Sequence, residues 1–414
     1  MRWASFLLVA SAFDLPEPSL VVPLVRLGYN VGLEQLWLRG GADDASAPAS
    51  NLSLSRVLLD SGSSNLIVRA CHDAAGAAAA PPACYPATSA TARASLSNAS
   101  AARECARLLL DEASLASFSR CTEHDDALAL ARRADGAGAP RWAPRAPLLA
   151  ARRLNASDAW LYPSWAFRDD AAAEQPGLGG VLGLGYFDAR LTLRAEAGAD
   201  DASARSNAVS SLEAEAAGAP SDPLLWALDV DDPASAADDG ALAPAAPGAL
   251  YLGGVPRARV AALAAAGAAV GWAEYHHAEQ PLSDGYPQLE LELFEPRVCG
   301  ARLLSNWSRS WVAHVDTGAA CLTLPREHFD VLRAWLPTPT RCGPPPADAG
   351  GRSARARFLC YFNASVADAA AGDDGRFPWL SFALAQDGPS VHLRLASLLL
   401  DETTADGELS LIHI

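Results

Sequence analysis

The sequence predicts a mostly β protein built from two similar lobes, and two observations support this prediction. Short apolar runs alternate with clusters of Gly, Pro, Asp and Ser, which is typical of strands joined by turns. One local pattern also occurs twice, at residues 57–68 and 312–324: an apolar run ends in Asp-(Ser/Thr)-Gly and is followed by small residues and a second apolar run. With 414 residues, the chain is long enough for two domains of ordinary size.

The strand prediction depends on apolar runs in both halves of the chain. Residues 20–25 form an apolar run around one Pro, and residues 36–38 form a shorter run around a Trp. Residues 289–293 alternate strictly between Leu and Glu, which is typical of a strand with one buried and one exposed face. Runs of this length, bounded by turn residues, favour β-sheets.

One segment has a helical period instead. Phe329, Leu332 and Leu336 fall at positions i, i+3 and i+7, and Trp335 lies beside them. This spacing predicts a helix over residues 326–336 that presents one apolar face, which includes Trp335.

The composition narrows the classes of partner and ligand. The formal net charge of −16 argues against a nucleic-acid or anionic-membrane partner. Ala is over-used and the basic residues are all Arg, which indicates a bias in the nucleotide composition of the gene. Because this bias inflates the apparent helix propensity, we predict no helix for the Ala-rich run at 261–269. No Cys or His cluster has zinc spacing, so we expect no metal and no cofactor. No apolar run reaches the roughly 20 residues that span a bilayer, so no membrane anchor is visible.

The first residues predict entry into the secretory pathway. Met1 and Arg2 precede a mostly apolar stretch, and Ala10-Ser11-Ala12 fits a cleavage site, so we assign residues 1–18 to a signal peptide and the start of the mature chain. A buried first strand is the alternative. An even number of Cys, eight, and five glycosylation sequons agree with a secreted, endomembrane or vacuolar glycoprotein. The sequons are at Asn51, Asn98, Asn155, Asn306 and Asn363.

The paired Asp-(Ser/Thr)-Gly motifs resemble those of the pepsin-like aspartic proteases. Residues 180–186 are similar to the apolar-apolar-Gly strand that threads behind the first catalytic loop in that family. Residues 226–228 and 249–254 resemble the strand pair that closes the first lobe, and residues 377–384 resemble a late strand of the second. These segments occur in the family's order, so the resemblance covers most of the chain.

This resemblance implies a bilobal, pepsin-like double-ψ β-barrel fold. The N-terminal lobe would be residues 19–255, with the first catalytic Asp and long surface insertions, and the C-terminal lobe would be residues 256–414 with the second. The Ala-, Pro- and Ser-rich stretches between Asp60 and Gly180 are interpreted as insertions. An apolar-apolar-Gly strand is also expected after Gly318, but the sequence has none, so we expect the second lobe to be truncated and to lack its last strands.

The activity that the resemblance implies is that of an aspartic endopeptidase. Asp60 and Asp316 would form a dyad that shares one proton and activates water at acidic pH. The substrate would be a polypeptide in extended conformation, held in a cleft between the lobes of a monomer. The alternatives are a catalytically weak or inactive binding or inhibitor protein of the same fold, and a truncated fragment.

The residues next to each acid would support the dyad. In the resemblance, Gly62 and Gly318 let the two loops approach each other. The hydroxyls of Ser61 and Thr317 would bond to the backbone of the opposite loop, and Ser63 would support the first acid.

Two positions depart from the family's pattern. Leu110 stands where the flap that covers the substrate is expected to carry a Tyr. Ile67 stands where an aromatic partner for that Tyr is usual, so closure over the substrate would lack a phenolic hydrogen bond.

Loop length and the family resemblance also favour local disulfide bridges, although eight Cys permit 105 connectivities. Three pairs are preferred, with Cys299 and Cys321 left over. The preferred pairs are Cys71 with Cys84, Cys105 with Cys121, and Cys342 with Cys360.

Overall fold

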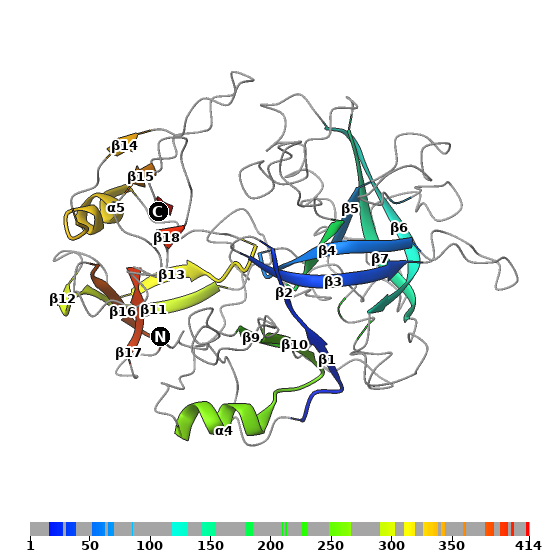
Figure 1. The fold of residues 1–414 in the computed structure, drawn as a ribbon, viewed down its shortest axis with the longest axis horizontal. Coiled ribbons are helices and arrows are strands. Elements are labelled where there is room, and N and C mark those ends of the chain that lie inside the picture. Colours follow the sequence, from blue (N-terminus) through cyan, green and yellow to red (C-terminus); the bar gives the residue numbers. More distant parts are fainter. Residues whose placement is uncertain are drawn as a thin grey trace, which may run out of the picture.

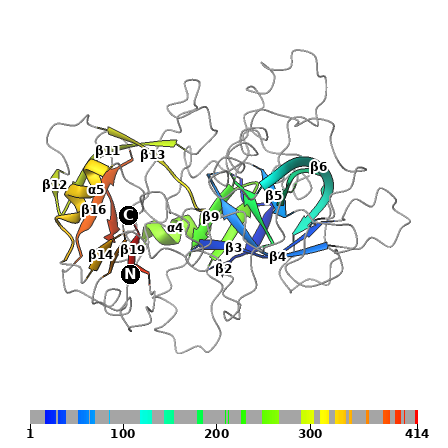
Figure 2. The same ribbon diagram turned by 90° about the horizontal axis from the view of Figure 1, so that it is seen from above.

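The computed structural model of the chain is mostly β, as the sequence predicts (Figure 1). It describes residues 16–27, 30–38, 52–62, 65–69, 85, 118–130, 143–153, 179–184, 209, 212, 226–230, 248–265, 290–302, 310–318, 326–337, 341–343, 359–361, 377–384, 390–395, 399–400 and 411–413. We refer to the described residues up to 265 as the N-terminal half and to those from 290 onward as the C-terminal half. Figures 1 and 2 show most strands of the two halves gathered on opposite sides of the molecule.

The N-terminal half contains a seven-stranded sheet in the order β2-β3-β4-β8-β5-β7-β6. A further pairing between β3 and β6 brings the two sides of this sheet together, so that it curls into a partial barrel (Figure 1). A second sheet, in the order β1-β10-β9, is antiparallel throughout. The strands are β1 (Leu20–Pro23), β2 (Val25–Leu27), β3 (Asn30–Leu38), β4 (Leu52–Asp60), β5 (Leu66–Arg69), β6 (Phe118–Leu130), β7 (Ala143–Arg153), β8 (Gly180–Gly183), β9 (Trp226–Val230) and β10 (Gly248–Leu252).

The C-terminal half also contains two sheets. One has the order β12-β11-β16-β17, with β13 also paired to β11, and the other has the order β14-β15-β19-β18. The strands are β11 (Glu290–Val298), β12 (Ala301–Arg302), β13 (Ser310–His314), β14 (Arg341–Gly343), β15 (Leu359–Tyr361), β16 (Trp379–Ala383), β17 (Ser390–Arg394), β18 (Leu399–Leu400) and β19 (Leu411–His413).

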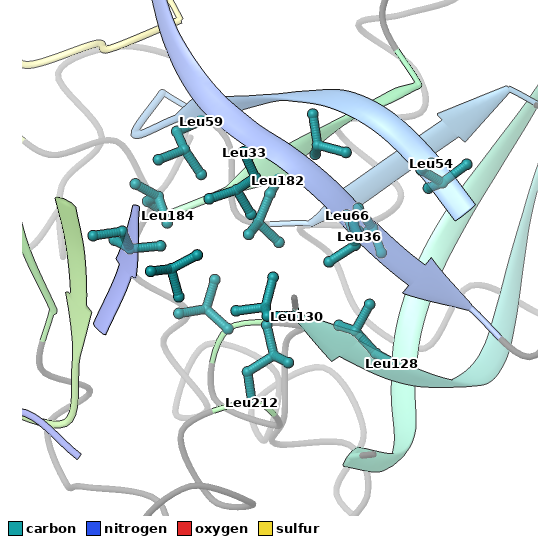
Figure 3. Packing of buried hydrophobic residues seen from close by; sticks show 14 of the residues in the cluster. Leu33, Leu36, Leu54, Leu59, Leu66, Leu128, Leu130, Leu182, Leu184 and Leu212 are labelled. Atoms are coloured by element: carbon teal, nitrogen blue, oxygen red, sulfur yellow. The ribbon is translucent and has the colours of Figure 1, made fainter. Parts of the chain in front are cut away.

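Each half buries its own cluster of apolar side chains. The larger cluster lies in the N-terminal half, where Leu residues from β3, β4, β5, β6 and β8 point into the curled sheet (Figure 3). A smaller cluster in the C-terminal half joins β11, β16 and β17 to the helix α5 (Arg326–Arg333). Because burial of one Leu or Val contributes about 1.5–3 kcal/mol, each cluster stabilises the half of the chain that contains it.

The expected strand pairs and the expected helix are present in the described residues. Strand β9 pairs with β10, with Leu228 opposite Leu250, and the late apolar segment forms β16. The helix α5 (Arg326–Arg333) forms where the spacing predicts one. The prediction that Trp335 joins its apolar face is wrong, because this side chain is 45% exposed. The helix ends at Arg333, two residues before Trp335. Hydrogen bonds between residues three apart tighten the turn that follows and move Trp335 off the apolar face.

Two further elements differ from the sequence interpretation. The sequence predicts no helix for the Ala-rich run at 261–269, yet residues 261–265 of this run form the second half of α4 (Arg257–Ala265). Its first turn follows Pro256, whose carbonyl accepts a bond from Val260 N, and Ala has the highest helix propensity. The region between Asp60 and Gly180 is not made only of insertions, because the long β6–β7 hairpin forms part of the N-terminal core. The sequence of this hairpin is rich in Ala and charged residues, which have low β-propensity, so the pattern does not predict its strands.

Candidate active site

Strand β4 delivers Asp60 to the end of a buried strand. Its residues Val57, Leu58 and Leu59 are fully buried, and β3 and β8 pair with its two edges. The short strand β8 runs parallel to β4 and antiparallel to β5. It therefore lies between the strand that enters the Asp60 turn and the strand that leaves it. This is the position that the sequence interpretation gave to the apolar-apolar-Gly segment.

Main-chain hydrogen bonds from β8 fix both sides of the Asp60 turn. Leu184 N donates to the carbonyl oxygen of Asp60 at 2.8 Å, and Gly183 N donates to the carbonyl oxygen of Asn65 at 3.0 Å. Both acceptor residues are buried, so these bonds are shielded from competing water. These two bonds hold both ends of the turn through main-chain groups alone.

Strand β4 also carries a strained residue, four positions before Asp60. Arg56 has a φ of 56°, in the left-handed region that a long side chain seldom adopts. Partial burial lowers the pKa of its guanidinium through desolvation. Backbone conformations of this kind cost about 1–3 kcal/mol and persist only where the surrounding structure imposes them. The pairing of β4 on both edges provides that constraint.

Strand β13 delivers Asp316 from the C-terminal half. It pairs with β11, with His314 opposite Glu290, and Asp316 follows two residues after its end. Among the strands that the structure describes, β13 pairs with β11 alone. The Asp316 turn therefore has a strand on one side, whereas the Asp60 turn is flanked by β8 as well.

The two turns meet through four reciprocal hydrogen bonds. Ser61 N donates to Thr317 Oγ1 at 3.0 Å, and that hydroxyl donates to the carbonyl oxygen of Leu59 at 2.9 Å. In the opposite direction, Thr317 N donates to Ser61 Oγ at 3.0 Å, and Ser61 Oγ donates to the carbonyl oxygen of Val315 at 2.6 Å. Each hydroxyl thus accepts one bond from the opposite turn and donates one to it.

The two carboxylates are held in equivalent ways. Gly62 N donates to Asp60 Oδ1 and Gly318 N donates to Asp316 Oδ1, both at 2.8 Å. Each amide therefore orients the acid two residues before it. The repeated geometry follows from the repeated sequence pattern, because the same Asp-(Ser/Thr)-Gly turn places the same amide next to the same carboxylate.

The two glycines lie directly against the acids of the opposite half. A Cβ added to Gly62 would lie 2.7 Å from Cγ and Oδ2 of Asp316. A Cβ added to Gly318 would lie 2.6 Å from Oδ1 of Asp60 and 3.1 Å from Oδ1 of Asp316. Both oxygens lie close to the position of this added Cβ, so the two carboxylates lie side by side.

The two acids differ in exposure. Asp60 is buried, with 3% of its surface exposed, whereas Asp316, Thr317 and Gly318 are only partly buried. The pair is therefore reached by solvent from the side of Asp316. Two adjacent carboxylates on a partly open surface can bind one water and exchange protons with it.

Six of the predicted site residues thus come together: Asp60, Ser61, Gly62, Asp316, Thr317 and Gly318. Ser63 and Leu110, the proposed flap position, lie outside the described residues. Ile67 is buried within β5, with 2% of its surface exposed. The hydroxyls of Ser61 and Thr317 bond to the backbone of the opposite turn, as the resemblance implies. The sequence did not indicate which carbonyl groups accept these bonds, because main-chain groups leave no signal in the choice of side chain.

The other predicted features are described only in part. Cys342 and Cys360 are directly opposite each other in the β14–β15 pair, and Cys299 is exposed and free. The other expected bridges each include a Cys outside the described residues. No cluster of three or more potential metal ligands occurs in the described part of the chain. Within the same residues, no helix is long and apolar enough to cross a bilayer.

The chain was also compared with known proteins. No family model matches it, and a search of curated proteins finds no significant match.

Proposed function

We propose that this chain is an aspartic endopeptidase with a bilobal, pepsin-like double-ψ β-barrel fold. The observation that carries the proposal is the meeting of Asp60 and Asp316, from opposite halves of the chain, across four reciprocal hydrogen bonds. A structural role alone would not require two carboxylates to lie side by side, because two like charges this close repel each other. The insertion of β8 between β4 and β5 supports the fold assignment.

In the proposed reaction, the two carboxyl groups share one proton and hold one water. The ionised carboxylate takes a proton from the water as its oxygen attacks the carbonyl carbon of the substrate peptide. The protonated carboxyl group donates its proton to the carbonyl oxygen, which gives a tetrahedral diol. The diol then collapses: the carbon–nitrogen bond breaks as the leaving nitrogen takes a proton from the protonated carboxyl group. One diol hydroxyl gives its proton to the ionised carboxylate as the carbonyl forms again, so the pair regains its shared proton. Activity is lost when both acids are ionised, because no proton donor then remains.

Replacing either acid by its amide tests the proposal. Asp60→Asn and Asp316→Asn keep the size of the side chain but remove the shared proton. We expect each variant to lose cleavage of an unfolded protein substrate at acidic pH by at least about 1,000-fold, because the acid and the base act as a unit. Circular dichroism provides the control for folding. Full activity in either variant would refute the assignment.

Binding of a statine-type mimic separates the proposal from its alternative. Such a compound places a hydroxyl where the dyad holds the tetrahedral intermediate, so tight binding requires both acids in place. We expect calorimetric binding to the parent chain and none to Asp316→Asn. A folded chain that binds peptides but neither cleaves them nor binds the mimic would be a binding protein.

A further inference from the structure

The sheet β12-β11-β16-β17 of the C-terminal half has two different faces. Val298, Leu380 and Leu393 lie opposite one another and pack with α5 in the smaller apolar cluster, so this face is the inner one. The residues one position further along each strand point to the outer face, because side chains alternate along a strand and residues directly opposite share a face. They form one row across all four strands, which we call the basic row: Arg302, Arg297, Ser381 and His392.

The basic row is open to solvent and has an aromatic neighbour. Arg302 and His392 are exposed, and the side chain of Arg297 is 38% exposed. Trp379, which is 39% exposed, lies two residues before Ser381 on the same face, and its ring meets that of His392 edge-on with the centroids 6.3 Å apart. The strands of this sheet lie on the side of the molecule away from the curled N-terminal sheet (Figure 1). Arg and Trp side chains are both enriched where proteins bind one another.

The row carries an excess of positive charge that the fold itself does not require. Arg297 and Arg302 lie directly opposite each other, and like charges in this position destabilise a sheet. Arg297 forms an ion pair of 2.6 Å with Glu295, and its Nη1 also donates to the carbonyl oxygen of Gly300 at 3.2 Å. In the part of the chain that the structure describes, Arg302 forms no ion pair. A basic row of this kind stands out in a chain with a formal net charge of −16.

We propose that the basic row binds an acidic stretch of a polypeptide in extended conformation. Three strand spacings of about 4.8 Å place the two ends of the row roughly 14 Å apart. Side chains at positions i, i+2 and i+4 of an extended peptide lie on one side and span about 13 Å, so acids at alternate positions match the row. The guanidinium groups bind carboxylates through paired hydrogen bonds. The acidic remainder of the surface repels such a peptide, which confines binding to the row.

The basic row is separate from the acid pair. Strand β11 runs from Glu290, opposite His314 at the end of β13, to Val298 beside the row. At about 3.3 Å per residue, the row lies roughly 20 Å along this strand from the end of β13 that precedes Asp316. A segment bound at the row therefore leaves the Asp turns uncovered. The inference concerns binding and does not depend on the proposed hydrolytic activity.

Fluorescence anisotropy with a labelled peptide of about ten residues, with Glu at every second position, tests the proposal. At about pH 6.5 the Glu side chains are ionised. We expect the parent chain to bind this peptide, and to bind it more weakly when the salt concentration is raised from about 0.05 M to about 0.5 M. A peptide with Gln at the same positions should not bind. The proposal is wrong if neither peptide binds, if both bind equally, or if a sulfated glycan such as heparin binds and the Glu peptide does not.

Variants of the row locate the binding site. Arg297→Gln/Arg302→Gln should weaken binding of the Glu peptide at least about tenfold, because one exposed charge pair contributes up to about fivefold. Arg302→Gln alone should weaken it about threefold, and it decides the question if the double variant does not fold, since no ion pair within the described residues is lost. Arg257→Gln, an equal change of charge at an exposed position of α4, is the matched control and should bind like the parent chain. Parent-like binding in a folded Arg302→Gln variant, or equal losses in Arg302→Gln and Arg257→Gln, would overturn the proposal.

Discussion

Replacing Gly62 by Ala is a sharp test of the site, because one added methyl group should disturb the acid of the opposite half. The new Cβ would lie 2.7 Å from Cγ and Oδ2 of Asp316 and 2.9 Å from its Oδ1, whereas ordinary contact begins at 3.4 Å. The Asp316 carboxylate, or the whole turn, must therefore move by about 0.7 Å. A displacement of about 1 Å at a catalytic group costs about 100-fold in rate. We therefore expect kcat to fall by roughly 30-fold or more.

The assay is hydrolysis of an internally quenched peptide at acidic pH, with kcat and KM measured separately. Under the proposed mechanism the main effect should be on kcat, because the displaced carboxylate would act on the reacting atoms. Urea unfolding gives the accompanying loss of stability, for which we expect about 1–3 kcal/mol from overpacking.

Gly300→Ala is the matched control. Gly300 lies in the exposed β11–β12 turn, with no atom within 4 Å of an added Cβ, but its φ is +81°. The substitution should cost about 1 kcal/mol through backbone strain and leave kcat unchanged. A Gly62→Ala variant with the parent kcat would refute our reading of the contact between Gly62 and Asp316.

Three further predictions concern the contact between the turns and one exposed turn. Thr317→Val removes two hydrogen bonds at nearly constant volume, and we expect a loss of about 2 kcal/mol in urea unfolding. Ser61→Ala should cost a similar amount, and in a double-mutant cycle the two losses should fail to add by at least about 0.5 kcal/mol; additive losses would mean that the turns do not depend on each other. Cys299→Asn should stabilise the protein by about 0.5–1 kcal/mol, because Cys299 and Gly300, with φ values of 48° and 81°, form a turn that favours Asn-Gly. Cys299→Ser removes the same thiol and should give a smaller gain, so equal midpoints in urea for the two variants would count against this explanation.

The sequence was most informative where a local pattern dictates local geometry. The two Asp-(Ser/Thr)-Gly motifs predicted their own turns, because each Gly amide must lie close to the acid two residues earlier. The contact between the two turns could be expected only from the repetition of the motif, since no residue near Asp60 in the sequence indicates that Asp316 lies beside it.

The sequence was least informative where tertiary contacts outweigh local preference. Strand β6 carries several charged residues, yet it pairs with both β7 and β3 and buries His124 and Asp126. Likewise, nothing in the pattern around Gly254 indicates that the backbone of Pro16 and Glu17 packs against it. Main-chain contacts between distant segments leave little trace in the choice of side chains, except for the glycines that allow them.

The hydrogen bonds between Ser61 and Thr317 join residues 256 positions apart. Contacts of such long range form late in folding, since each half must first order its own sheet before its turn has a fixed shape. The acid pair is therefore not a property of either half. It requires the contact between the two halves, so a chain that has regained its β-structure but not this contact carries both acids without bringing them together.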